Sequence, residues 1–113
     1  MRLVDFDFDI QGELRPGLTT FRVENAASQP HEVFLFALER GATAQQALAW
    51  LENPQGPPPF SAQGGVAFLS SGQANNFSVR LRAGDYGLIC FIPDATDGRP
   101  HFAHGMIRQI TIR

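Results

Sequence analysis

Short segments in which apolar and polar residues alternate, separated by glycine- or proline-containing turns, run through most of this chain. Successive side chains of a β-strand point to opposite sides, so a period of two residues places one face in a core and the other in water. Seven segments have β-strand character: residues 4–10, 18–24, 31–38, 66–70, 77–82, 86–92 and 107–112. Many short strands between frequent turns are typical of sandwiches. We therefore predict an all-β, antiparallel Greek-key β-sandwich of about seven strands.

One segment carries a helical pattern instead. Thr43 is followed three residues later by Gln46, the spacing of a capping box, and alanine and leucine recur at helical intervals behind it. We predict one short inserted helix over residues 43–53. Proline and glycine then crowd residues 54–59. Because proline lacks a backbone donor, the connection should stay irregular until Gly65.

Size and charge narrow the class of protein. The chain has 113 residues, of which 43% are hydrophobic and 18% charged, which favours a single domain over residues 1–113 with a real core rather than a disordered segment. Its net charge is −2, and all nine cationic side chains are arginines scattered along the chain. This pattern argues against binding to nucleic acid or to anionic membranes. No apolar run is long enough for a transmembrane helix.

Side chains that ligate soft metals gather at the ends of predicted strands. His31 begins one strand, Cys90 lies near the end of another, and His101, His104 and Met106 follow in the next loop. If the two strands are neighbours, that loop can fold back over both. One thiolate and two imidazoles, with a weakly bound thioether, form the set that copper uses for electron transfer.

Two stretches around these residues resemble the ligand motifs of cupredoxins, the family of plastocyanin, pseudoazurin and the copper domains of nitrite reductases. Residues 23–34 contain Val-Glu-Asn and then Pro-His-Glu-Val-Phe, similar to the first motif. Residues 84–90, Gly-Asp-Tyr-Gly-Leu-Ile-Cys, followed by His-Phe-Ala-His-Gly-Met at 101–106, are similar to the second. The resemblance implies that His31, Cys90 and His101, with Met106 on the axis, hold one copper ion in a type 1 site.

The resemblance also implies a function and a cellular location. A cupredoxin-like protein would carry single electrons to a redox partner protein by transient contact, would not be an enzyme, and would be exported to the periplasm or the cell exterior. His104 would be a neighbour of the site rather than a ligand. His101 would lie nearest solvent and act as the electron gateway, with Phe102 and the proline-rich residues 54–59 forming the docking surface.

Three features depart from the family pattern. Ten residues separate Cys90 from His101, more than in plastocyanin-like domains, while nitrite reductases have a comparable extended loop. Glu32 stands where an asparagine commonly ties the ligand loops together, and Phe91 stands where a small polar residue is common. Groups around the ligands set metal affinity. The alternative function is therefore a cupredoxin-fold interaction module or copper carrier with a weak or absent metal site.

Other interpretations of single residues stay open. Tyr86, Leu88, Cys90 and Ile92 share one face of a predicted strand, so Cys90 is also explained as an ordinary buried thiol. Zinc accepts the same nitrogen and sulfur donors and is a possible substitute for copper. The acidic row within residues 4–10 is better explained as a solvated strand face than as a calcium site.

Overall fold

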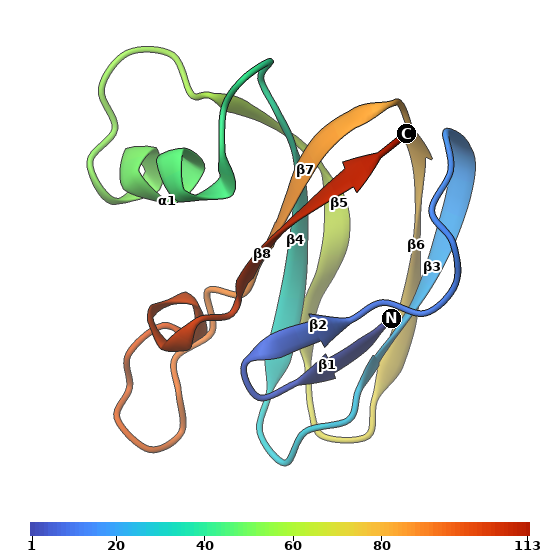
Figure 1. Ribbon diagram of the computed structural model, residues 1–113. Helices are drawn as coiled ribbons and strands as arrows, with labels where there is room; N and C mark the ends of the chain where they lie inside the picture. Colours follow the sequence, from blue (N-terminus) through green and yellow to red (C-terminus); the bar gives the residue numbers. More distant parts are fainter.

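The computed structural model describes residues 1–113 and has two four-stranded sheets packed face to face (Figure 1). The first sheet has the order β2-β1-β3-β6, with β1 at Arg2–Val4, β2 at Asp7–Asp9, β3 at Gly17–Asn25 and β6 at Ala74–Leu81. The second has the order β5-β4-β7-β8, with β4 at His31–Leu38, β5 at Phe60–Leu69, β7 at Gly84–Ile89 and β8 at Ile107–Ile112. The helices are α1 (Ala44–Glu52) and the short 3₁₀ helix η1 (His101–His104). The predicted β-sandwich with one inserted α-helix is confirmed.

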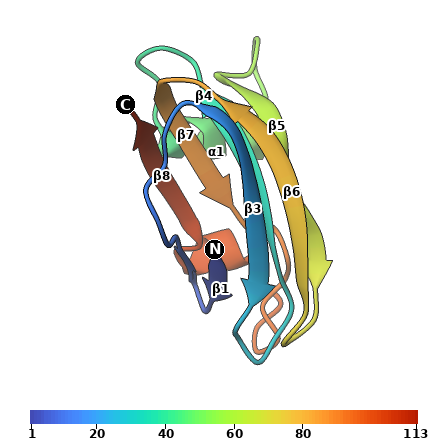
Figure 2. The same ribbon diagram turned by 90° about the vertical axis from the view of Figure 1, so that its right-hand side faces the viewer.

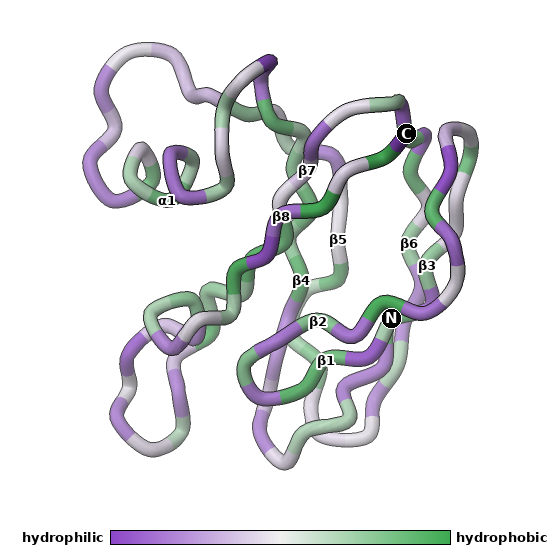
Figure 3. The backbone as a smooth tube through the Cα atoms, viewed as in Figure 1, coloured by the Kyte–Doolittle hydropathy of each residue, from purple (hydrophilic) through white to green (hydrophobic).

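The core lies between the two sheets. Fifteen buried residues form one cluster to which both sheets contribute, among them Leu3, Val23, Leu35, Leu88 and Cys90. Figure 3 shows the alternation of hydrophobic and hydrophilic residues along β1 and β2, and Figure 2 shows β3 and β6 of the first sheet in front of β4 and β7 of the second. None of the helices has the length and apolar character needed to cross a membrane.

The first predicted strand, residues 4–10, is wrong as a single element. Val4 pairs with Asp7, so β1 and β2 form a tight hairpin around a two-residue turn, and Leu3 and Phe8 lie opposite each other in the core. That turn contains no glycine or proline to mark it. β1 also pairs with β3 in parallel, whereas the other strand pairs of the predicted antiparallel sandwich are antiparallel.

The capping box at the start of α1 is confirmed. Gln46 N–H donates to Thr43 Oγ1 at 3.1 Å, and Thr43 N–H donates to Gln46 Oε1 at 2.9 Å. The helix covers the outer face of the second sheet, where Ala47 packs with Phe36 and Ile89 in a second apolar cluster. A side chain at Gly87 would overlap the ring of Phe36, so glycine is needed at that point of β7.

The fifth strand begins earlier than predicted. β5 starts at Phe60 and pairs with β4 as far as Leu69, with irregularities in its register. The expectation of irregular structure up to Gly65 is therefore wrong for residues 60–65. The polar side chains of this exposed edge strand hide its alternation. A Cβ at Gly65 would overlap the carbonyl oxygen of Val33, because the two strands approach closely there.

The direction of β4 defines two ends of the sandwich. β4 begins at the end where η1 lies, which we call the His31 end, and finishes at the end where α1 lies, which we call the Leu38 end (Figure 1). The proline-rich residues 54–59 connect α1 to β5, whose first residue pairs with Leu38. This connection therefore lies at the Leu38 end, away from His31.

Candidate metal centre

Three of the four predicted ligands converge at the His31 end. His31 is the first residue of β4, Cys90 directly follows β7, and His101 begins η1. β4 and β7 are antiparallel neighbours, so the start of one meets the end of the other. Cys90 Sγ lies 3.9 Å from His31 Nδ1 and 3.5 Å from His101 Nδ1. All three side chains are fully buried, and they form a group able to hold a metal ion.

The ten-residue connection between Cys90 and His101 does not separate them. Pro93 and Pro100 form a bridge, and Asp94 N–H donates to the Arg99 carbonyl at 2.7 Å, which closes the intervening residues into a side loop. Phe102 N–H then donates to the Cys90 carbonyl at 3.1 Å. The extra length is absorbed locally, and His101 returns beside Cys90.

Met106 lies in the same core cluster as Cys90 and is fully buried. Its carbonyl accepts a hydrogen bond from Cys90 N–H at 3.2 Å, and its own N–H donates to the His101 carbonyl at 3.1 Å. The backbone of Met106 is thus tied to both neighbouring ligand positions. The thioether as an axial ligand stays a prediction.

Each histidine ring is fixed from its far side. His31 Nε2 lies 2.6 Å from Asp5 Oδ1, and His101 Nε2 lies 3.0 Å from Gln29 Oε1. Both oxygens are acceptors, so each ring carries its proton on Nε2 and directs the lone pair of Nδ1 toward Cys90. Such partners orient the ligands of metal sites.

Gln29 joins these partners into one network. Its Nε2 donates to Asp5 Oδ1 at 3.2 Å and to Asp94 Oδ1 at 3.0 Å, while its Oε1 also accepts from Ala95 N–H at 2.9 Å. Sequence reasoning missed Gln29, Asp5 and Asp94 as residues of the site. The only signal for Gln29 was its position two residues before His31. Asp5 and Asp94 had no such signal in the sequence, because their positions in the site depend on the turn after β1 and on the side loop.

Glu32 takes over the role expected of an asparagine. Its carboxylate Oε1 accepts from Phe91 N–H at 3.1 Å, and its backbone N–H donates to Cys90 Sγ at 3.5 Å. Glu32, near the start of β4, is thus bonded both to Cys90 Sγ and to the backbone of the next residue, Phe91. The departure from the family pattern at Glu32 therefore keeps the connection between the ligand segments.

Burial sets the protonation of the metal-free site. Desolvation raises the pKa of the Cys90 thiol, against the smaller opposing effect of the Glu32 N–H. Desolvation also lowers the pKa of His101, and the nearby His31 lowers it further. Without metal, the group is therefore one neutral thiol and one neutral His101 imidazole beside His31. Binding of a metal would displace the thiol proton.

His104 lies outside this group. Its Nε2 is 2.8 Å from Asp97 Oδ2, and its ring stacks on Phe6 with centroids 5.0 Å apart. The pKa of Asp97 is lowered first by the Arg99 N–H and then by His104. His104 helps to hold the side loop, as a neighbour of the centre.

The expectation that His101 lies nearest solvent gains no support from exposure, because His31, Cys90 and His101 are all fully buried. His101 is 0% exposed, because Gln29 and Asp94 cover its outer edge. The proline-rich residues 54–59 cannot form a docking surface around it either, since they lie at the Leu38 end. The apolar surface next to the site is formed instead by Phe91, which is 36% exposed and packs edge-on against Phe102.

The donor geometry fits a copper-sized ion. Bonds of about 2.1 Å to nitrogen and about 2.3 Å to sulfur, at angles of about 110–120°, place the two donor atoms about 3.6–3.8 Å apart. The two sulfur–nitrogen distances of 3.5 and 3.9 Å bracket that range. The pair of imidazoles with a thiolate is the trigonal donor set of blue-copper sites.

Comparisons with known proteins agree at the level of the fold. No family model and no curated protein matches the sequence. Among solved structures, the chain is similar to the Na-dithionite-reduced auracyanin of the photosynthetic bacterium Roseiflexus castenholzii, a cupredoxin. The TM-score is 0.57 at 17% identity, over 96% of this chain and 84% of auracyanin. The protein therefore has a cupredoxin fold with a His-Cys-His group at one end, which confirms the resemblance at the level of the fold.

Proposed function

We propose that this protein carries single electrons through one copper ion, which His31, Cys90 and His101 would hold with Met106 as a fourth, weaker ligand. The observation that carries the proposal is the convergence of two Nδ1 atoms on one buried sulfur. Copper would supply the exchange of one electron between its two oxidation states. The protein makes and breaks no bond in this role, so we propose no enzymatic activity.

Burial supports electron transfer over copper delivery. All three donors are fully buried and the outer edges of both imidazoles are hydrogen-bonded. A carrier that hands its ion to another protein needs a ligand that can be reached from outside. An electron carrier needs the reverse, a donor set held in one geometry so that little reorganises when the charge changes.

The partner protein would dock over Phe91. This side chain follows Cys90 directly, so it gives a short covalent path from the sulfur to the surface. With Phe102 it offers a small apolar patch, which suits weak and transient contact. Phe91→Ala should slow electron self-exchange between copper-loaded molecules, whereas Phe68→Ala, at another exposed phenylalanine, should not. Equal rates in both variants would refute docking at Phe91.

The test of the copper site is direct. Cu(II) added to the reduced protein at neutral pH should give an intense thiolate-to-copper absorption band in the visible, with one copper per chain by metal analysis. His104→Asn is the matched control, because it removes an imidazole outside the His31–Cys90–His101 group; that imidazole belongs to a separate group with Asp94 and Asp97, which has no thiolate to give the visible band. A full band in this variant and in the wild type is expected.

Other outcomes point to the alternatives. No band and no bound copper would leave a cupredoxin-fold interaction module. One colourless zinc ion per chain, undisplaced by copper, would make the site structural. We further propose that residues 1–113 form one domain and that the protein works in an exported compartment. Fractionation of the native cells tests the compartment, and recovery in the cytoplasm would contradict it.

A further inference from the structure

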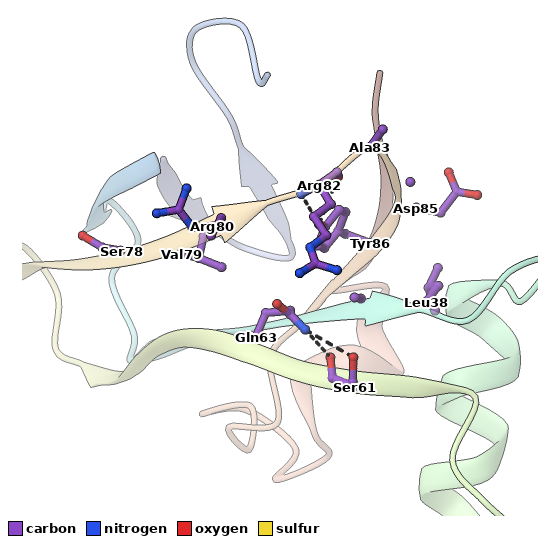
Figure 4. A pocket seen from close by; sticks show the side chains of 12 residues that line it. Leu38, Ser61, Gln63, Ser78, Val79, Arg80, Arg82, Ala83, Asp85 and Tyr86 are labelled. Atoms are coloured by element: carbon purple, nitrogen blue, oxygen red, sulfur yellow. Dashed lines mark hydrogen bonds between the residues drawn. The ribbon is translucent and has the colours of Figure 1, made fainter. Parts of the chain in front are cut away.

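The Leu38 end contains a cavity that plays no part in the copper site. Its volume is about 650 Å³, and the side chains around it include Ser61 and Gln63 of β5, Ser78 and Arg80 of β6, Arg82 directly after β6, and Tyr86 of β7 (Figure 4). Small-molecule sites typically occupy about 300–1,000 Å³. The cavity therefore has the size of a site for a small ligand.

The topology explains why the cavity forms there. β5 is the edge of one sheet and β6 the edge of the other, and no backbone ladder joins them. A short turn connects β5 to β6 near the His31 end, where Gln73 N–H donates to the Ser70 carbonyl. Farther along, the two edges are free to diverge. The space between them opens to solvent at the Leu38 end.

Arg82 is one of three charged residues that line this cavity, with Arg80 and Asp85. Figure 4 shows the Arg82 guanidinium reaching from the segment directly after β6 toward Gln63 and Ser61 on the facing edge. Tyr86 Oη accepts from Arg82 N–H at 2.8 Å and donates to the Arg82 carbonyl at 3.1 Å. The buried tyrosine thus fixes the backbone from which the guanidinium extends.

The positive charge in the cavity has no internal counterpart. Arg82 and Arg80 form no ion pair, a condition they share with Arg40, Arg99 and Arg113, whereas the remaining four arginines each lie within 4 Å of a carboxylate. The one acidic residue of the lining, Asp85, accepts a hydrogen bond from Thr111 Oγ1 at 2.6 Å. Figure 4 shows its carboxylate pointing away from Arg82. The cavity therefore presents donors without an anion.

We infer that this cavity binds a small organic anion carrying a carboxylate or a phosphate group, with Arg82 as the main contact and Arg80 on the rim. A guanidinium presents paired N–H groups that match both kinds of oxyanion. The Ser61 hydroxyl and the Gln63 amide stand on the facing edge to receive the rest of the ligand. A recess of this size between two edges suits a small molecule better than the broad acidic surface of a protein.

The experiment follows backbone amide signals of the isotope-labelled full chain by NMR during titration. Inorganic phosphate and succinate are added separately at constant ionic strength, which distinguishes the two oxyanion classes. Saturable shifts are expected at Ser61, Gln63, Arg82 and Gly84, with none at Cys90. Arg82→Gln should weaken binding about tenfold or more, the loss expected for one charge-assisted contact, and Arg80→Gln should weaken it less.

Arg22→Gln is the matched control. It removes the same charge from an exposed arginine on the other strand of the β3–β6 pair, where the guanidinium already pairs with Glu24, so the affinity should not change. Shifts that do not saturate, that chloride reproduces, or that persist equally in Arg82→Gln would overturn the proposal. Binding of a tetraglutamate peptide, with none of either small anion, would also overturn it and would make the region a protein-docking surface. The amide spectrum of Arg82→Gln itself reports whether that variant is folded.

Discussion

The polar side chains at the two ends of the sandwich differ in burial and in hydrogen bonding. At the His31 end, the outer nitrogens of His31 and His101 are partnered, and the three candidate ligands are removed from water. At the Leu38 end, arginines stand in an open recess whose one carboxylate, Asp85, pairs with Thr111 and not with them. Buried polar groups need hydrogen-bond partners within the protein, whereas exposed polar groups bond to water until a ligand replaces it. Under our two proposals, the first end holds one metal ion and the second binds a soluble anion reversibly.

The difference arises from how the strands meet. At the His31 end, the start of β4 is hydrogen-bonded to the end of β7, and the loop after Cys90 folds over both. At the Leu38 end, the cavity lies between two sheet edges that no ladder joins. Hydrogen-bonded neighbours can hold side chains within bonding distance of one atom, while diverging edges leave room for solvent.

The largest expected effect separates the two ends. Cys90→Ser should abolish the visible copper band completely, because a hydroxyl gives no thiolate-to-copper absorption, and it should leave anion binding unchanged. Arg82→Gln should weaken anion binding and leave the copper band unchanged. Absorption spectra and amide titrations of the two variants measure both sites. Loss of copper binding in a folded Arg82→Gln variant would break the comparison by showing that the ends are coupled.

The next effect concerns the network behind the ligands. Gln29→Ala removes the partner of His101 Nε2 and of Asp94. Copper affinity should fall by about 10–100-fold, and the metal-free protein should lose about 1–3 kcal/mol of unfolding free energy because buried groups are left unpaired. Competition with a chelator and urea unfolding measure the two quantities.

Gln63→Ala is the matched control at the other end. Gln63 bonds only to Ser61 on an exposed edge, so its removal should change neither copper affinity nor stability appreciably. Equal losses in Gln29→Ala and Gln63→Ala would show that the network around His101 has no special role.

The smallest effect is a dependence on pH. Burial holds the pKa of His101 below its usual value. As the pH falls through about 6.5, the His101 imidazole therefore becomes protonated in the unfolded chain but stays neutral in the folded chain. The pKa values of Asp94 and Asp97 are also lowered, first by Gln29 and by the Arg99 N–H respectively, and they act in the same direction in more acidic solution. The stability of the metal-free protein should therefore decrease from pH 7 to pH 5 and further below pH 4.

Urea unfolding at several pH values measures this dependence, and His101→Gln should flatten the slope between pH 7 and pH 5. Copper affinity should fall over the same range, because the Cys90 thiol, whose pKa is raised by burial, must give up its proton to bind. A metal-free protein equally stable at pH 7 and pH 5 would contradict the burial of a neutral His101.

Local patterns predicted the elements whose signals are local. β4 and β8 have the predicted bounds, and the capping box of α1 lies at Thr43 and Gln46. The hairpin of β1 and β2 escaped prediction because the alternation of apolar and acidic residues continues through the turn at Asp5 and Phe6, which no glycine or proline marks. The start of β5 escaped because an exposed edge strand needs no apolar face.

The residue types and spacing along the chain determined which donors are available: two imidazoles and a thiol at the ends of strands, with a thioether close by. Tertiary structure alone decided how they are used. Asp5, Gln29 and Asp94 come from three separate segments and meet only when the sheets pack, so their hydrogen bonds, the burial of His101 and the free arginines of the opposite cavity have no signature in any local stretch. Hydrogen bonds and solvent exposure depend on distances in space, and a sequence fixes those only through the fold.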